Sequence, residues 1–212
     1  MPKVQSTRKS GKIRLDNQDA IVRAAEIEFA RFGYKGASML NIAKRAGIPR
    51  PNVHYYFKNK LELYNTVLMD ILKLWNDAFN QITVDDDPGS AIGAYIHAKV
   101  MYSKTNPLAS KVFANEIIHG GPHLSEYLQQ EFRLWMKEKA TVLQAWIDQG
   151  KMDPIDPLHL IFLIWSSTQY YADYAIQVTT VLDKTELTDE DFEAIAETLK
   201  RIILKGCGIP YP

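Results

Sequence analysis

The segment spanning residues 38–57 constrains the fold most, because it fits two short helices joined by a tight turn. Its first helical pattern, MLNIAKRA in residues 39–46, follows Ser38, whose side chain can cap a helix, and stops at Gly47. The reversal there needs a backbone angle that is costly for residues other than glycine. A second short helix can begin within residues 49–51, because proline is tolerated in the first turn of a helix. Such a pair is typical of a helix-turn-helix DNA-binding motif.

A longer helical pattern precedes this pair and can supply a helix against which it packs. Apolar side chains in residues 16–33 recur at spacings of three and four, Asp16 or Asn17 can cap the start, and Gly33 can end the helix. The apolar stripe consists of Ile21, Ala25, Phe29 and Phe32. The two short helices are expected to form a small core from Leu40, Ile42, Ala43, Ile48 and Val53. The sequence thus predicts a three-helix domain over residues 16–60.

Charge is distributed unevenly between this part of the chain and the rest. Residues 1–60 contain thirteen Lys and Arg but four acidic residues, a balance of +9, whereas residues 61–212 carry a balance of −9. Such an asymmetry indicates that the first part binds a polyanion and the second part does not. A solvated charged face with a basic flexible tail, residues 1–15, is the alternative, but the basic excess extends beyond the tail into patterned sequence.

Eight side chains in or beside the two short helices are candidates for DNA binding. They are Lys44, Arg45, Arg50, Asn52, His54, Tyr55, Lys58 and Lys60. The second short helix would enter the major groove, whose width suits one helix. Arg50 and Asn52 lie near its N-terminal end and are the best candidates for base edges. Tyr55, Lys58 and Lys60 suit phosphate contacts.

The rest of the chain fits six further helices and has no convincing strand pattern. The six patterns cover residues 61–82, 91–105, 109–121, 123–151, 157–182 and 189–204. Apolar residues form a stripe along the first of them, which suits a helix that joins two domains: Leu61, Tyr64, Leu68, Ile71, Leu72, Trp75 and Phe79. We therefore expect an all-α chain, with a helix-turn-helix domain followed by a bundle of about six helices in residues 61–212.

Enzyme chemistry finds little support in the sequence. There is no GxSxG, HExxH, P-loop or GxGxxG motif. Glu116 and His119 share a helical face and could bind a metal only if other carboxylates converged, so we expect no metal and no cofactor. Cys207 is the single cysteine and is interpreted as a bystander. No apolar run approaches the roughly 20 residues of a membrane-spanning helix, and no secretory signal is evident, so a cytoplasmic location is expected.

Residues 24–68 resemble the N-terminal domain of the TetR family of transcriptional regulators. The features that carry the resemblance are Phe32 to Tyr34, Gly36, Ile42 and Ala43, Ala46 to Ile48, Tyr55 to Phe57, Lys60 and Leu63. The resemblance implies an all-helical DNA-binding protein in which the tyrosines and Lys60 contact phosphates. It also implies a sensor domain in the C-terminal half, and a homodimer that pairs through the last two long helices. One or both of Tyr56 and Phe57 are expected to pack the domain rather than contact DNA.

The segment IWSSTQYYADYAIQV, residues 164–178, mixes aromatic rings with hydrogen-bonding groups inside an otherwise apolar helix. Trp165 and Gln169 share one face of that helix with Ala172 or Asp173, so one side could offer a ring beside an amide and a carboxylate. Thr168, Tyr171 and Ala172 share another face. A planar polar ligand would fit such a wall. The same segment could instead form a dimer interface, where aromatic residues are enriched. Both can hold on opposite faces, and the sequence does not divide them.

The C-terminal half also resembles a pyrimidine-responsive member of the TetR family. The resemblance lies in residues 108–117, 150–157, 157–178 and 201–206. It implies a repressor that uracil or a close pyrimidine releases from DNA. The ligand-binding candidates are Trp75, Lys99, Phe113, Glu116, Trp165, Gln169, Tyr171 and Asp173. The alternatives are a hydrophobic drug or acyl effector, an enzyme with a DNA-targeting head, and a DNA-binding protein without any ligand.

Overall fold

The computed structural model describes residues 4–211, with side chains from residue 14 onward, and all regular secondary structure in this range is helical. The chain divides into two compact units, one that ends at Ile71 and one that begins at Leu72. Helix α4, Lys60–Asn80, spans this border. The sequence had placed the border after residue 60, at the start of α4, whereas the structure places it in the middle of that helix.

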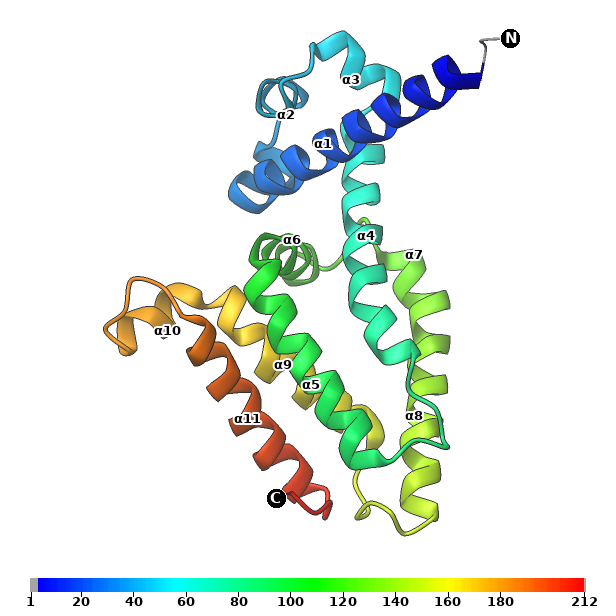
Figure 1. The fold of residues 1–212 in the computed structure, drawn as a ribbon, viewed down its shortest axis with the longest axis vertical. Helices are drawn as coiled ribbons and strands as arrows, with labels where there is room; N and C mark the ends of the chain where they lie inside the picture. The colour runs from blue at the N-terminus through cyan, green and yellow to red at the C-terminus, as the bar shows by residue number, and fades with distance from the viewer. Residues whose placement is uncertain (1–3, 212) are drawn as a thin grey trace. The chain divides into compact units, whose positions relative to one another are not determined.

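The first unit contains α1 (Val4–Gly36), α2 (Met39–Ala46), α3 (Arg50–Tyr56) and the beginning of α4 (Figure 1). Helices α2 and α3 match the predicted helix-turn-helix pair. The hydroxyl of Ser38 accepts a hydrogen bond from the backbone N–H of Asn41 at 3.1 Å, and so caps α2. Gly47 ends α2 in the left-handed region, at φ 67°, which explains why glycine occupies the turn.

Helix α1 is longer than the sequence indicates. It begins at Val4, so the expected start at Asp16 or Asn17 is wrong, and residues 4–15 are helical where a basic tail was expected. No proline interrupts residues 4–36, and the helix can therefore continue toward the N-terminus. Residues 1–3 of the expected tail lie outside the described residues. The predicted stop at Gly33 is confirmed, because this residue breaks the helical geometry with φ 64° and ψ 177°.

The core of the first unit follows the predicted pattern with two exceptions. Ile42 and Val53 are fully buried, but Leu40 is 45% exposed and Phe32 is 54% exposed. Leu40 is two residues from Ile42, which puts it on the opposite side of a helix with 3.6 residues per turn. Phe32 immediately precedes the helix break at Gly33. The small core is therefore made without these two side chains.

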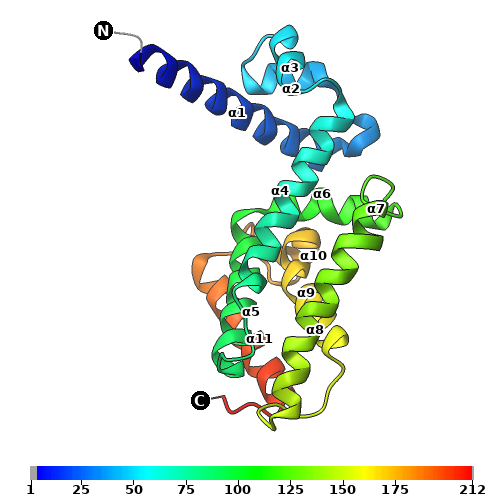
Figure 2. The same ribbon diagram turned by 90° about the vertical axis from the view of Figure 1, so that its right-hand side faces the viewer.

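The second unit contains the rest of α4 and the remaining helices (Figure 2). These are α5 (Pro88–Thr105), α6 (Pro107–Ile118), α7 (Ser125–Tyr127), the π-helical segment η1 (Leu128–Phe132), α8 (Arg133–Asp148), α9 (Pro157–Asp173), α10 (Ala175–Val181) and α11 (Asp189–Gly206). Helix α5 packs against both α9 and α11, and α9 also packs against α6 and α8. Among the described residues, no helix is long and apolar enough to cross a membrane.

Two predicted long helices are interrupted. Residues 123–151 form α7, η1 and α8, and the π-helical segment shifts the register of the helical faces between them. Residues 157–182 form α9 and α10, which are separated at Tyr174. Asp173, the last residue of α9, accepts a hydrogen bond from Ser110 of α6. Five of the seven residues of α10 are β-branched, and such residues favour helices less than unbranched ones.

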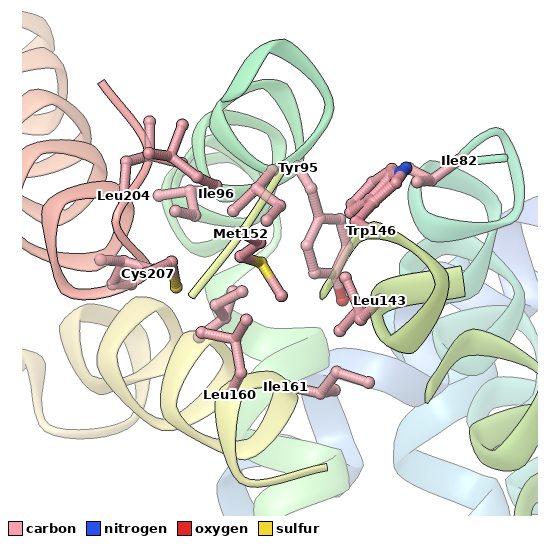
Figure 3. Packing of buried hydrophobic residues seen from close by; sticks show 14 of the residues in the cluster. Ile82, Tyr95, Ile96, Leu143, Trp146, Met152, Leu160, Ile161, Leu204 and Cys207 are labelled. Carbon is pink, nitrogen blue, oxygen red and sulfur yellow. The ribbon is translucent and has the colours of Figure 1, made fainter. Parts of the chain in front are cut away.

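The core of the second unit is an apolar cluster built by α4, α5, α8, α9 and α11 (Figure 3). Trp146 is fully buried in it, and its indole N–H donates to the carbonyl of Val84 at 3.1 Å. Cys207 is 1% exposed and packs in the same cluster, so the cysteine that was interpreted as a bystander is part of the core. Helix α5 packs against α9 and α11 in this core. Its side chains at successive turns, such as Tyr95 and Lys99, are therefore buried inside the unit.

Candidate functional site

Helix α3 presents a polar and aromatic surface on the side opposite to its core contact. Val53 is fully buried and Phe57, just after the helix, is 3% exposed. The outward residues are Arg50, Asn52, His54 and Tyr55, with Lys58 following the helix, and all five are exposed. Tyr55 has 72% of its surface exposed. The predicted recognition surface on α3 is thus free of contacts that would bury it within the first unit.

Lys60 has a different position from the one expected of a phosphate contact. Its ammonium donates to the carbonyl oxygens of Tyr34 at 2.7 Å and Ala37 at 3.0 Å, with Lys35 at 3.4 Å. It also lies 4.6 Å from the centroid of the Tyr34 ring. Carbonyls at the end of a helix lack intrahelical partners and attract cations. Lys60 therefore ties the start of α4 to the end of α1.

Arg45 is partly engaged by a buried carboxylate that the sequence analysis missed. Glu28 on α1 is 1% exposed, and its carboxylate accepts a hydrogen bond from Asn41 Nδ2 at 3.0 Å. The Arg45 guanidinium lies 3.8 Å from the same carboxylate. The only sequence signal was an acidic residue beside the inward-facing Ala25 and Phe29. Glu28 thus orients α2 on α1, and Lys44 remains as an exposed cation of α2.

The two tyrosines of α3 have separate environments. Tyr56 accepts a hydrogen bond from Asn17 Nδ2 at 3.2 Å, so it packs the domain as expected. Tyr55 lies edge-on to Tyr56, with 5.3 Å between ring centroids, and the Arg14 guanidinium lies 5.9 Å from the Tyr55 ring. These contacts leave the Tyr55 hydroxyl at the surface beside a cation of α1. Lys58 is fixed at its backbone, where its N–H donates to Glu62 Oε2 at 2.9 Å.

Four helices of the second unit bring one group of predicted ligand-binding residues together around Lys99. The Lys99 ammonium lies 4.3 Å from the centroid of the Trp75 ring, and the Trp75 and Phe113 rings meet edge to face at 4.9 Å. The Ser110 hydroxyl donates to Asp173 at 2.5 Å. We call Trp75, Lys99, Ser110, Phe113 and Asp173 the Lys99 group. It combines a cation, a carboxylate and two aromatic rings.

The charges of the Lys99 group are strongly affected by burial. Lys99 is 2% exposed, and burial lowers the pKa of its ammonium to about 7, against a smaller opposing effect of the Asp173 carboxylate. Burial raises the pKa of Asp173, while its hydrogen bond from Ser110 and the charge of Lys99 act in the opposite direction. A polar ligand between these groups would meet charges that are poorly solvated and hence interact strongly.

Trp165 belongs to an adjacent aromatic group, one helical turn away. Its indole N–H donates to the Tyr95 hydroxyl at 2.6 Å, and its ring stacks with that of Trp135 at 6.4 Å. The Tyr95 ring stacks on Phe79 at 4.5 Å. We call Phe79, Tyr95, Phe132, Trp135 and Trp165 the Trp165 group. Residues four apart on a helix are neighbours, so α5 places Tyr95 one turn from Lys99, and α4 places Phe79 one turn from Trp75.

The other three predicted ligand-binding residues, Gln169, Tyr171 and Glu116, belong to neither the Lys99 group nor the Trp165 group. Gln169 is half-buried on α9 between the turns that carry Trp165 and Asp173, as expected. Tyr171 packs instead against the small apolar cluster that contains Val100 and Phe192, because its position on α9 faces α11.

Glu116 is 3% exposed and is bound by His123, whose backbone N–H lies 2.7 Å and whose Nδ1 lies 3.0 Å from the carboxylate. His119, the partner considered for a metal pair, has its Nδ1 2.7 Å from the carbonyl of Asn115. The described residues contain no group of three or more His, Cys, Asp or Glu side chains arranged to hold a metal.

The outer face of α9 is apolar and exposed. Phe162 and Leu163 are each 49% exposed, Tyr170 is 38% exposed, and Tyr174 just beyond the helix is 51% exposed. On α11, Ile202 is 60% exposed. The inward face of α9 carries its fully buried side chains instead, namely Leu160, Ile161, Ile164, Thr168 and Ala172. Trp165, Gln169 and Asp173 are half-buried, and the Trp165 ring lies 6.0 Å from that of the exposed Phe162. The ligand candidates of α9 thus lie at the border between its core face and its exposed apolar face.

Comparisons with known proteins match both units. A family model described as "Bacterial regulatory proteins, tetR family" matches residues 21–67, and one described as "YcdC-like protein, C-terminal region" matches residues 68–210. The chain is 37% identical over 203 residues to the HTH-type transcriptional regulator RutR of Escherichia coli K12, covering 96% of each chain. It is 27% identical to the HTH-type transcriptional repressor NicS of Pseudomonas putida, covering 73% of this chain and 74% of NicS.

Solved structures share the fold. The TetR family transcriptional regulator PfmR from Thermus thermophilus superposes with a TM-score of 0.69 at 17% identity, covering 87% of this chain and 97% of PfmR. At this identity the likeness concerns the fold alone. The matched proteins are named as transcriptional regulators, in keeping with the absence of enzyme motifs from the sequence.

Proposed function

Because the chain belongs to the TetR family of bacterial transcriptional regulators, we propose that it is a repressor that binds operator DNA as a homodimer and is released by uracil or a related pyrimidine. The support for DNA binding is the exposed polar surface of α3. Arg50 and Asn52 would contact base edges in the major groove, while Tyr55, Lys58 and Lys44 would contact phosphates. DNA binding would place the protein in the cytoplasm.

The homodimer is proposed to form through the outer faces of α9 and α11. The apolar side chains exposed there, such as Phe162, Tyr170 and Ile202, would be buried by the same surface of a second copy. Two recognition helices in such a dimer must reach successive major grooves, which are separated by about 34–36 Å or a multiple of it. This requirement makes the repressor sensitive to any change in the spacing of its two DNA-binding domains.

The observation that carries the effector proposal is the enclosure of Lys99 by Trp75, Phe113 and Asp173. A planar ring can stack on the aromatic side chains, and its carbonyl and N–H groups can pair with the ammonium, the carboxylate and the Gln169 amide. The resemblance of the C-terminal half to a pyrimidine-responsive member of the family supports uracil as the ligand. A purely hydrophobic drug or acyl chain would leave the charged groups unpaired, which is costly.

Release from DNA would proceed through α4, which starts at the helix-turn-helix domain and carries Trp75 in the second unit. A ligand that binds better to a conformation with a different spacing of the DNA-binding domains would shift the population toward it. The shift is limited by the difference in the ligand's affinity for the two states. The proposed mechanism is therefore a two-state equilibrium that uracil displaces from the DNA-binding form.

The direct test is to select operator sequences from random DNA in the absence of uracil and then to measure release of the selected duplex as uracil is added. Trp75→Ala and Gln169→Ala should reduce the response to uracil by at least tenfold and leave operator affinity within twofold of wild type. A wild-type protein that binds its operator equally well with and without pyrimidines, but responds to lipids in a thermal-shift panel, would contradict the effector assignment.

A further inference from the structure

Tyr95 belongs to the Trp165 group and also to the wall of a surface pocket between α4 and α5. The pocket has a volume of about 420 Å³. Its apolar lining consists of Ala78, Ile82, Ala91, Ala94, Tyr95 and Ala98. Figure 3 shows Ile82 and Tyr95 in the core of the second unit. The pocket thus extends from exposed residues to a tyrosine that is 3% exposed.

Alanines keep this pocket open. Ala91, Ala94 and Ala98 recur at spacings of three and four on one face of α5, and Ala78 faces them from α4. A methyl group is too short to fill the space beside it, whereas longer apolar side chains at the same positions would close it. Ala94 is exposed at the outer side. The pocket therefore gives small molecules access as far as Tyr95.

Two members of the proposed effector site are deeply buried, whereas Phe113 and Asp173 are partly exposed. Trp75 is 8% exposed and Lys99 is 2% exposed, so contact of a ligand with these two side chains requires movement of a neighbouring side chain. Two contacts fix Tyr95, namely the hydrogen bond from Trp165 at 2.6 Å and the stack on Phe79 at 4.5 Å. Movement of the Tyr95 side chain away from Trp165 and Phe79 would break both contacts.

We propose that the effector enters through the pocket between α4 and α5 and that Tyr95 is the gate. This inference rests on the effector site under Proposed function. When Tyr95 moves, the indole N–H of Trp165 loses its acceptor, and a buried donor without a partner is unfavourable. A carbonyl oxygen of the effector takes the place of the tyrosine hydroxyl. The gate thus selects planar ligands with a carbonyl at the ring edge over hydrocarbons.

The test measures uracil binding to the full-length protein by calorimetry and its rates by stopped-flow tryptophan fluorescence. Ala94→Phe places a ring in the pocket and should slow association and dissociation by at least tenfold each, with the Kd within twofold of wild type. Gln144→Phe, at an exposed position of α8, is the matched control and should change neither rate. Unchanged rates in Ala94→Phe, with normal uracil binding, overturn the entrance and leave the effector assignment intact.

A second variant blocks the pocket only after the protein has folded, so an effect on folding is separated from an effect on ligand entry. Ala94→Cys can be labelled with a bulky aryl maleimide after the protein has folded, since Cys207 is 1% exposed and shielded from the reagent. The labelled protein should bind uracil at least tenfold more slowly than the same protein before labelling. Equal rates before and after labelling overturn the entrance. Absence of uracil binding in the wild type would refute the effector assignment and the gate together.

Removal of the Tyr95 hydroxyl tests whether an effector carbonyl replaces this hydroxyl as the acceptor of the Trp165 indole N–H. Tyr95→Phe keeps the ring but leaves the Trp165 N–H free for the effector, so uracil should associate about five- to tenfold faster and bind more tightly. Tyr102→Phe on the same helix is the control and should behave as wild type. Weaker uracil binding by Tyr95→Phe would mean that the hydroxyl contacts the bound ligand, and would overturn the exchange.

Discussion

The two units position their functional side chains by contacts of different range. In the first unit, α2 and α4 are capped by neighbours in the sequence: Ser38 accepts from Asn41, and Asn59 accepts from Glu62. In the second unit, the proposed effector site depends on pairs that are far apart in the chain. Trp165 and Tyr95 are 70 positions apart, and Ser110 and Asp173 are 63. The helix-turn-helix pair is capped locally, and Asn17 of α1 adds a contact to Tyr56 from 39 positions away, whereas the proposed effector site draws on four separate helices.

The units also differ in how they hold cations. Lys44 and Arg50 are exposed to water and Arg45 is partly paired with Glu28, whereas Lys99 in the second unit is 2% exposed. Burial of an ammonium costs free energy unless a ligand or a carboxylate compensates it. The second unit therefore gives up stability to keep a charge in its proposed effector site, whereas the exposed cations of α2 and α3 carry no such cost.

The largest expected effect is a change in stability when the buried cation of the second unit, Lys99, is removed. Burial lowers the pKa of Lys99 from 10.5 to about 7, so between these values the unfolded state binds more protons than the folded state. Stability should then rise as pH increases from 7 toward 10.5, and the full cost of the charge is present below pH 7. Lys99→Met should stabilise the protein by about 2–4 kcal/mol at pH 6, with a smaller gain at pH 9, and should abolish the uracil response.

Urea unfolding at pH 6, 7.5 and 9 measures this effect. Lys111→Met, a partly exposed lysine of α6, is the control and should change stability by less than about 0.5 kcal/mol at each pH. A Lys99→Met protein that is less stable than wild type at pH 6 would mean that the contacts with Trp75 and Asp173 outweigh the cost of burial.

The next largest effect concerns Glu28, which is 1% exposed. This residue is an exception to the comparison, because it is a buried carboxylate in the first unit. Its carboxylate joins α1 to Asn41 and Arg45 of α2. Glu28→Ala removes these bonds and leaves a gap in the core, so it should destabilise the first unit by about 2–3 kcal/mol and weaken operator binding. Asp19→Ala, at an exposed position of the same helix, should be nearly neutral.

Hydrogen exchange resolves the two units and shows where the loss falls. Amides of α1 and α2 should lose protection in Glu28→Ala, while those of α5 and α9 keep it. Equal loss of protection in both units would mean that they unfold together. The first and second units would then not be stabilised separately.

The range of the contacts explains what could be predicted from the sequence. Helix α2 was predicted at its observed bounds and α3 to within about one residue at each end, because Ser38 and Gly47 act within a few residues. Trp75, Lys99 and Asp173 could be proposed together only by resemblance to a family, since no spacing in the sequence brings α4, α5 and α9 into contact.

The features that the sequence did not predict also depend on contacts between residues that are far apart in the chain. In the sequence, Tyr95 looks like any other aromatic residue of α5, and the role proposed for it depends on its hydrogen bond with Trp165 of α9. The break between α9 and α10 follows Asp173, which accepts a hydrogen bond from Ser110 of α6. The inward orientation of Lys60 toward the carbonyls of α1 depends on how α4 packs against that helix. Periodicity contains no information about such contacts.

The smallest expected effect compares two helix caps of the same kind, one in each unit. Ser38 caps α2, and Thr188 caps α11 in a reciprocal pair with Asp191. Either residue mutated to alanine removes one cap and should cost about 1 kcal/mol in urea unfolding. Ser38→Ala should also weaken operator binding several-fold, because α2 supports the recognition helix, whereas Thr188→Ala should leave it unchanged. If Thr188→Ala weakened operator binding as much as Ser38→Ala, local stability in the second unit would control DNA binding, and the two units could not be treated as separate.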